Sequence, residues 1–218
     1  MNNNIKRKKF NLSILGEKTV GKTCLVESLL GKPFNESRIA TIGIDTISHK
    51  FKIDGKEYVF KIFDTAGQER YNSVAATTIK IADGFLLVYS VNNKESLEKI
   101  NIWIQNIEDF VNRKEKVLML VGNKIDIKER TISKEEGMAF AKERNMKYFE
   151  TSAKTGFGIK EAFNQIFNDI YELNKKGEEN QKSKNVKQTT EKNSSNQNNE
   201  NIVLGKKEHK KKNKSKFC

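Results

Sequence analysis

The segment Gly16–Thr23 constrains the fold of this chain more than any other part of the sequence. It reads Gly-Glu-Lys-Thr-Val-Gly-Lys-Thr and fits the pattern GxxxxGK[ST]. The apolar run Phe10–Leu15 precedes it, and residues with helical spacing follow it. A strand, a glycine-rich loop and a helix in this order indicate a parallel α/β unit. The alternative is a chance glycine-rich turn, which the flanking strand and helix argue against.

Apolar runs alternate with helical patterns as far as Leu173. The predicted strands are Phe10–Leu15, Ile44–Ile53, Glu57–Asp64, Gly84–Ser90, Val117–Gly122 and Lys147–Thr151. Predicted helices include Ser96–Val111 and Ile159–Leu173. Asp54-Gly55 is a tight hairpin signal, so the second and third strands should be antiparallel. We therefore predict an α/β fold: a six-stranded, mostly parallel sheet with one antiparallel hairpin-linked edge strand and helices on both faces.

The glycine-rich loop is a candidate site for phosphate groups and Mg²⁺. Its glycines let backbone N–H groups converge on phosphate oxygens, and the following helix adds positive charge at its N-terminus. Lys22 is expected to reach the β- and γ-phosphates, and the Thr23 hydroxyl to ligate Mg²⁺. Asp64, at the end of the third strand, can hold the same ion through water. Gly67 can donate its N–H to a γ-phosphate, and Gln68 can orient an attacking water.

Two more polar loops follow the fifth and sixth predicted strands. They are Asn123-Lys124-Ile125-Asp126 and Thr151-Ser152-Ala153-Lys154. A carboxylate can accept two hydrogen bonds from guanine, and such a site rejects other bases because its polar groups would be left unpaired. Taken alone, the Asn and Asp of the first loop would be read as helix caps. In order with the phosphate loop and Asp64–Gln68, they predict guanine binding.

With these motifs the chain resembles the Ras superfamily of small GTPases, and especially the Rab family, over residues 9–174. The Rab-like strings are Thr41–Asp45, Asp64–Arg70, Leu120–Asp126 and Glu150–Gly156. The stretch Met119–Phe163 is similar to the Rab subfamily linked to endoplasmic reticulum and lipid droplets. The resemblance implies a P-loop GTPase domain that binds GTP and GDP with Mg²⁺, hydrolyses GTP slowly and recruits effectors in vesicle trafficking. It also implies an exchange factor, a GTPase-activating protein and a GDP dissociation inhibitor as partners.

The resemblance implies roles for further residues. Thr41 would ligate Mg²⁺ and sense the γ-phosphate, and Phe34 would pack on guanine, although core packing is an alternative for Phe34. The Lys124 stem would cover the base, and the Ala153 N–H would donate to the guanine oxygen. The expected nucleotide-binding residues are Glu17, Lys18, Thr19, Val20, Gly21, Lys22, Thr23, Cys24, Phe34, Thr41, Gly67, Asn123, Lys124, Asp126, Ser152, Ala153 and Lys154. The expected metal ligands are Thr23, Thr41 and Asp64, and the expected catalytic residue is Gln68.

Several positions depart from the usual Rab pattern. Thr46, Phe63 and Thr78-Ile79 stand where Rabs carry an aromatic, a Trp and a Tyr pair that read partners. Lys18 stands where the families carry glycine or a small residue, and its side chain could crowd an arginine finger. A nucleotide-binding scaffold with little hydrolysis is therefore the alternative function. We interpret Trp103 as a core residue and Cys24 as a small packed residue.

The net charge of +13 is concentrated towards the end of the sequence, where residues 175–218 contain 13 lysines and 5 glutamates. We predict an N-terminal extension at 1–8, a GTPase domain at 9–174 and a disordered basic tail at 175–218. Nucleic-acid binding is an alternative reading of the charge, but the folded part lacks a basic and aromatic reading surface. We expect no nucleic-acid partner.

Membrane contact is expected to be peripheral, because no apolar stretch is long enough to span a bilayer and no signal peptide is recognisable. Two cysteines, Cys24 and Cys218, suit a reducing compartment. The resemblance suggests a prenyl group on Cys218, aided by the lysines of Lys206–Lys216. Palmitoylation and a merely solubilising tail are the alternatives. The expected location is the cytosol and the cytoplasmic face of an endomembrane of the ER, Golgi or endosomes.

Overall fold

The computed structural model describes residues 8–36, 43–65 and 72–179, and the side chains of all of these except 72–75. The chain divides into two units, Met1–Leu173 and Asn174–Cys218. The six strands described all lie in the first unit.

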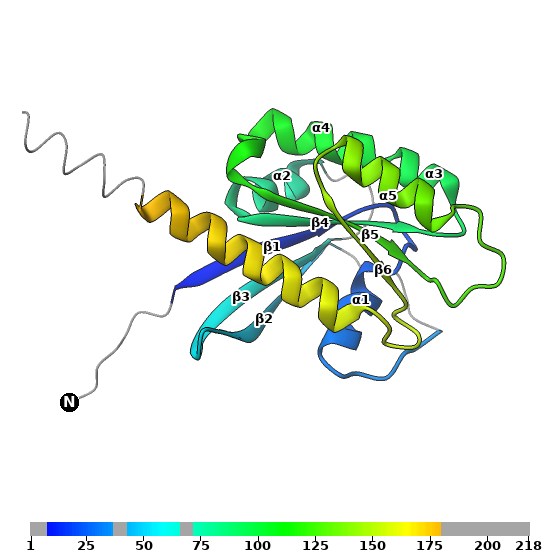
Figure 1. Ribbon diagram of the computed structural model, residues 1–218, viewed down its shortest axis with the longest axis horizontal. Helices are drawn as coiled ribbons and strands as arrows, with labels where there is room; N and C mark the ends of the chain where they lie inside the picture. The colour runs from blue at the N-terminus through cyan, green and yellow to red at the C-terminus, as the bar shows by residue number, and fades with distance from the viewer. Residues whose placement is uncertain (1–7, 37–42, 66–71, 180–218) are drawn as a thin grey trace, which may run out of the picture. The chain divides into compact units, whose positions relative to one another are not determined.

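The strands form one sheet in the spatial order β2-β3-β1-β4-β5-β6 (Figure 1). Only β2 runs antiparallel to its neighbour β3, and the other pairs are parallel. The bounds are β1 Lys9–Leu15, β2 Ile44–Ile53, β3 Lys56–Thr65, β4 Gly84–Ser90, β5 Val117–Asn123 and β6 Lys147–Thr151. Each predicted strand is present, with its ends displaced by one residue at most. The predicted fold class is confirmed.

The predicted hairpin joins β2 to β3. Ile53 pairs with Lys56, which leaves Asp54 and Gly55 as the turn. Their φ angles of 49° and 74° place both residues in the left-handed region. Two such residues in a row make the turn whose twist matches the flanking strands, which explains the Asp-Gly sequence.

Helices cover both faces of the sheet (Figure 1). On one face, α1 (Lys22–Leu29) and a final helix over residues 159–179 pack Leu25, Phe163 and Phe167 into one apolar cluster. On the other face, α2 (Asn72–Ile81), α4 (Ile100–Phe110) and α5 (Lys134–Glu143) contribute to a second cluster. Trp103 is a buried member of this second cluster, as predicted. Because both faces are covered, β4 is buried at every position.

The predicted helix Ser96–Val111 is present as two consecutive helices, α3 (Lys94–Glu98) and α4, that meet at Lys99. It begins two residues earlier than predicted, because the Asn93 side chain caps it by accepting a hydrogen bond from the Ser96 N–H at 3.1 Å. A short 3₁₀ turn, η2 (Arg113–Glu115), then leads into β5. Lys99 is thereby placed at a junction that faces the phosphate loop.

The final helix continues to residue 179, so residues 175–179 are helical where the sequence predicts disorder. Lysine and glutamate are good helix formers, and extending an existing helix avoids the cost of nucleation. The remainder of the predicted tail, residues 180–218, lies outside the described residues, as does most of the predicted N-terminal extension. None of the helices in the described part of the chain has the length and apolar character needed to cross a bilayer.

Candidate nucleotide-binding site

The glycine-rich loop connects β1 to α1 and wraps around the Lys22 ammonium. Lys22 is 5% exposed, and its Nζ donates to the carbonyl oxygens of Gly16 and Glu17, both at 2.8 Å. A Cβ on Gly16 would lie 2.1 Å from the Val88 carbonyl oxygen of β4, so only glycine fits there. Close packing of Gly16 against β4 therefore fixes the start of the loop, and the two hydrogen bonds from Lys22 hold the loop backbone curved around the ammonium group.

The electrostatics of this loop suit an anionic ligand. Burial lowers the pKa of Lys22 to about 8, while the carboxylates of Asp64 and Glu17 raise it. A phosphate beside Nζ would raise the pKa further, because an opposite charge favours the ammonium form. The loop thus presents a desolvated cation beside backbone groups at a helix N-terminus, where phosphates bind in proteins.

The end of β3 brings a carboxylate to the same place. Asp64 is fully buried and pairs in register with Ile14 of β1. The next residue, Thr65, donates its hydroxyl to the Ile14 carbonyl oxygen at 2.7 Å, which fixes the strand end. Thr23 is the second residue of α1, directly after Lys22. A carboxylate and a hydroxyl beside a phosphate site are the hard oxygen ligands that suit Mg²⁺, so these residues fit the ion.

Two features of the phosphate loop escaped the sequence prediction. Glu17 was predicted as a nucleotide-binding residue without any role for its side chain, and its carboxylate accepts a hydrogen bond from Lys99 Nζ at 3.1 Å. Lys99 also pairs with Glu95 at 3.1 Å, so the junction of α3 and α4 holds the side of the loop. Thr19 has φ 63°, in the left-handed region that a β-branched residue rarely adopts.

Asn123 joins the phosphate loop to both predicted base loops. Its side chain is 1% exposed, and its Nδ2 donates to the Val20 carbonyl oxygen at 2.8 Å. Its Oδ1 accepts from the Thr151 hydroxyl at 3.1 Å and from the Ala153 N–H at 3.3 Å. One amide therefore fixes three segments that are far apart in the sequence.

The predicted guanine carboxylate is held by the second base loop. The Ser152 hydroxyl donates to Asp126 Oδ1 at 2.5 Å and accepts from the Thr155 N–H at 3.1 Å. The Ile125 N–H donates to the Thr151 carbonyl oxygen at 3.3 Å, which joins the two loops again. The orientation of Asp126 therefore depends on Ser152, a role that the sequence pattern does not reveal.

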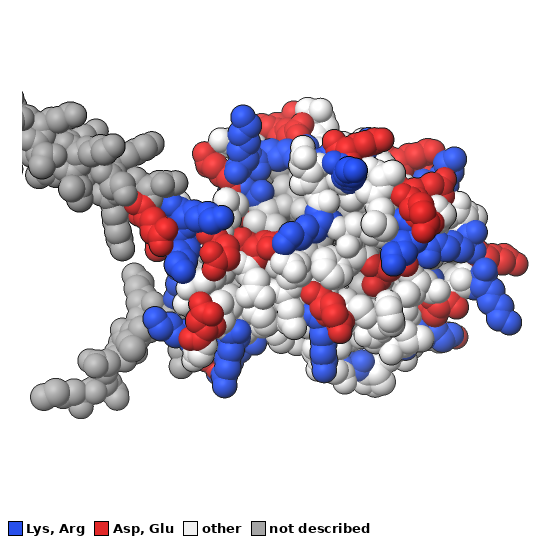
Figure 2. Space-filling view, in the orientation of Figure 1, with Lys and Arg blue, Asp and Glu red and all other residues white. Residues whose placement is uncertain are grey.

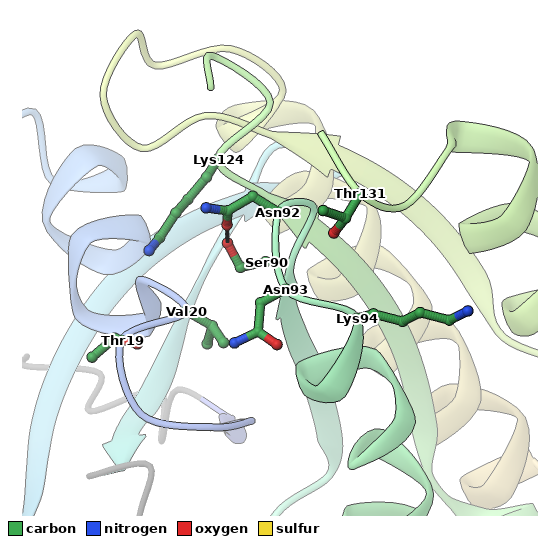
Figure 3. Close-up of a pocket in the computed structure, with 8 residues that line it drawn as sticks. All are labelled: Thr19, Val20, Ser90, Asn92, Asn93, Lys94, Lys124 and Thr131. Atoms are coloured by element: carbon green, nitrogen blue, oxygen red, sulfur yellow. Dashed lines mark hydrogen bonds between the residues drawn. The ribbon is translucent and has the colours of Figure 1, made fainter. Parts of the chain in front are cut away.

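A polar pocket of about 370 Å³ adjoins the phosphate loop (Figure 3). Thr19 and Val20 line it together with Lys124, whose side chain points towards the phosphate loop. Its other lining residues, which the sequence did not single out, are Ser90, Asn92, Asn93, Lys94 and Thr131. The Ser90 hydroxyl donates to Asn92 Oδ1 at 2.6 Å and shapes the wall contributed by the residues after β4.

The remaining predicted site residues differ in their surroundings. Thr41, Gly67, Gln68 and Cys218 lie outside the described residues. Lys18 is exposed in the phosphate loop, and Phe34 is 41% exposed, which excludes core packing for Phe34 in this structure. Lys154 pairs with Glu36, in the segment that follows α1, at 2.7 Å. Cys24 of α1 is partly buried and packs against the apolar cluster that contains Leu25, Phe163 and Phe167, as predicted for a small packed residue.

Comparison with known proteins identifies the family. The Ras family model matches residues 11–172. Rab-8 of Diplobatis ommata is 40% identical over 173 residues, covering 78% of this chain and 82% of its own. Human Rab-8B is 39% identical over 169 residues, covering 77% and 81%, and Rab-18 of Lymnaea stagnalis is 37% identical over 157 residues, covering 72% and 78%. The chain belongs to the Ras family and is a Rab-like small GTPase.

The predicted Rab resemblance is thereby confirmed at the level of the family. Rab-8 and Rab-18 relatives match this Rab-like GTPase at similar identities, so the more specific subfamily resemblance stays a prediction.

The residues that depart from the Rab pattern differ in how far they are buried. Thr46 is exposed on β2, whereas Phe63 of β3 and Thr78-Ile79 of α2 are buried. In this GTPase the last three cannot present a partner-reading surface of the expected kind without rearrangement.

Proposed function

We propose that this GTPase binds GTP and GDP with Mg²⁺, hydrolyses GTP slowly, and alternates between two conformations that govern effector recruitment at an endomembrane. The observation that carries the proposal is the Asn123 side chain, which holds the phosphate loop and both base loops together. Such an arrangement lets phosphate and base be recognised by one rigid unit. Exchange factor, GTPase-activating protein and GDP dissociation inhibitor are the partners that a Rab-like cycle requires.

The decisive test is base selectivity. In the proposed site Asp126 accepts two hydrogen bonds from guanine, so Asp126→Asn should weaken GTP binding at least about a hundredfold. The same variant should gain affinity for xanthosine triphosphate, whose 2-oxo group can accept from an amide. Titration of fluorescent nucleotides measures both changes. Equal binding of ATP and GTP by the unaltered protein would refute the proposal.

The metal assignment is tested separately. With Mg²⁺ present the bound ion supplies charge neutralisation at the phosphates, and Thr23 and Asp64 would hold it, together with Thr41. Thr23→Asn should therefore impair GTP binding more than GDP binding in Mg²⁺. Normal binding of GTP by this variant would contradict the role of the hydroxyl.

A nucleotide-binding scaffold with little hydrolysis is the second candidate, favoured by the exposed Lys18 in the phosphate loop. Single-turnover hydrolysis distinguishes the two candidates. In the switch enzyme, Gln68→Leu should slow intrinsic hydrolysis and leave nucleotide affinity nearly unchanged, because the amide acts on water. In the scaffold, hydrolysis is negligible, and Lys18→Ser should raise the rate measured with a GTPase-activating protein, because the Lys18 side chain crowds the arginine finger of that protein.

A further inference from the structure

An apolar groove of about 1270 Å³ lies between α5, β6 and the start of the final helix. Met138 of α5 is 50% exposed and Phe157, in the turn before the final helix, is 62% exposed. Figure 2 shows this face, with white, uncharged surface between charged side chains. Small-molecule pockets are commonly about 300–1,000 Å³ and enclosed, so the size and exposure of this groove suit a peptide segment better.

The margin of the groove is positively charged. Its charged lining residues are Lys134, Lys142, Lys160, Glu150 and Glu161. Glu150 is already neutralised, because it pairs with Arg130 and accepts a hydrogen bond from the Tyr148 hydroxyl at 2.9 Å. Three lysines therefore face one remaining carboxylate of the lining, that of Glu161. This charge pattern complements an acidic ligand.

The turn that carries Phe157 is held in place. The Ser152 N–H donates to the Phe157 carbonyl oxygen at 3.0 Å, and the Gly156 N–H donates to the Ser152 carbonyl oxygen at 2.8 Å. A Cβ on Gly158 would lie 2.2 Å from the Glu150 carbonyl oxygen, so the turn packs closely against β6. A preformed apolar surface loses little entropy when it is covered, which favours binding.

We propose that this groove docks an acidic, apolar peptide segment of a partner protein. The apolar side chains of the segment cover Met138 and Phe157, and its carboxylates meet Lys134, Lys142 and Lys160. The chain's own residues 175–218 are a poor occupant, because their 13 lysines and 5 glutamates carry the same sign of charge as the margin. The docking surface is formed by α5, β6 and the start of the final helix with the turn before it, and uses neither Thr41 nor Gln68.

The test uses the full chain with GDP and Mg²⁺, and two synthetic peptides. The first peptide is an amphipathic helix of about four turns, with leucine and phenylalanine on one face and glutamate on the other. The second has lysine in place of each glutamate. Calorimetry and amide chemical shifts should show the acidic peptide binding at Met138 and Phe157, about tenfold or more tightly than the basic one. Its affinity should fall as salt is raised.

Substitutions at exposed groove positions keep the test independent of folding. Met138→Ser and Phe157→Ser should each weaken the acidic peptide about tenfold, as expected for central apolar contacts. Lys142→Glu should weaken it a few-fold. Ile102→Ser is the matched control, because Ile102 is 52% exposed on α4, outside the lining of the groove.

Three results would overturn the proposal. The first is equal affinity for the two peptides, or affinity that the Met138 and Phe157 variants leave unchanged. The second is a change in the amide chemical shift of Phe157, without any peptide, when Ile202→Asp and Leu204→Asp are introduced. That change would assign the groove to the chain's own tail. The third is a change in the amide chemical shift of Phe157 with protein concentration alone, which would assign the groove to a second copy of the chain.

Discussion

Thr19 holds a left-handed backbone conformation in the phosphate loop, at φ 63°. A Cβ in that region costs roughly 1–2 kcal/mol, which exceeds the entropy cost of glycine of about 0.5–1 kcal/mol. We therefore expect Thr19→Gly to be more stable to unfolding than Thr19→Ala by up to about 1 kcal/mol. Urea denaturation of the GDP- and Mg²⁺-bound proteins measures the difference.

The control for this greater stability of glycine over alanine is an exposed position in a helix, where the opposite order is expected. Glu135 lies in α5, where Ala should be more stable than Gly by about 1 kcal/mol. If alanine is the more stable choice at both positions, the left-handed conformation of Thr19 imposes no cost.

Ser152 is predicted to act on guanine through Asp126. Removing a hydrogen bond to a charged group costs about 1.5–3 kcal/mol, so Ser152→Ala should release GDP about tenfold or more faster. The loss should be smaller for inosine diphosphate, which lacks the exocyclic amine that Asp126 is expected to bind. Displacement of fluorescent nucleotide measures both rates.

Thr155→Ala is the matched control for Ser152→Ala. Thr155 lies in the same loop and is exposed, and its hydroxyl accepts a long hydrogen bond from the Phe157 N–H at 3.4 Å. Equal acceleration of GDP release by the two variants would mean that the loop as a whole, rather than the bond to Asp126, controls release.

The sequence pattern found the residues of the site more readily than their contacts. Asn123 and Asp126 are recognisable because three positions separate them within one loop. The bond from Asn123 to Val20 joins residues 103 positions apart, and that from Lys99 to Glu17 joins residues 82 positions apart. Such contacts depend on the packing of whole elements, so no local spacing could have predicted them.

At the scale of elements, the bounds of helices and strands could be predicted where a turn or cap sequence marks them. The β2–β3 hairpin was predicted because Asp54-Gly55 can adopt two positive φ angles. The start of α3 was predicted two residues late, because the Asn93 cap precedes the first apolar residue of the helical pattern. The helical residues 175–179 were missed, since their composition is shared by helices and disordered segments.

Gly137 of α5 tests how this helix packs on the sheet. A Cβ there would lie 2.4 Å from the Tyr89 hydroxyl and 2.5 Å from the Tyr148 hydroxyl, and these two oxygens are hydrogen-bonded at 2.9 Å. Burial raises the pKa of both hydroxyls, so both remain protonated. Gly137→Ala should destabilise the protein by about 1–3 kcal/mol, although alanine is the better helix former. Thermal or urea unfolding measures the change.

Gly177→Ala is the matched control for Gly137→Ala. Gly177 is also helical, but a Cβ there would have nothing within 4 Å. This substitution should be neutral or should stabilise the helix by up to about 1 kcal/mol. Stabilisation by both substitutions would show that the tyrosine pair can move aside freely.

At the scale of the whole molecule, the uneven charge predicts how the protein meets a membrane. Residues 206–218 contain 7 lysines and 1 glutamate. A single lipid chain gives only marginal and reversible binding. We propose that Cys218 carries a prenyl group and that these lysines supply the second signal.

Each lysine near an anionic leaflet contributes about 1 kcal/mol, so changing all seven to glutamine should weaken binding of the lipidated protein to anionic vesicles by several orders of magnitude. Changing Lys182, Lys184 and Lys187 to glutamine is the control within the same tail, and it should have a smaller effect. Raising the salt concentration should mimic the loss of the cluster, because screening weakens exposed charges. Vesicle sedimentation measures the binding, and intact mass of protein from its native cell reports the modification. Binding that is indifferent to lipid charge and to Cys218→Ser would contradict both parts of the proposal, since neither the cation cluster nor the lipid would then hold the protein at the surface.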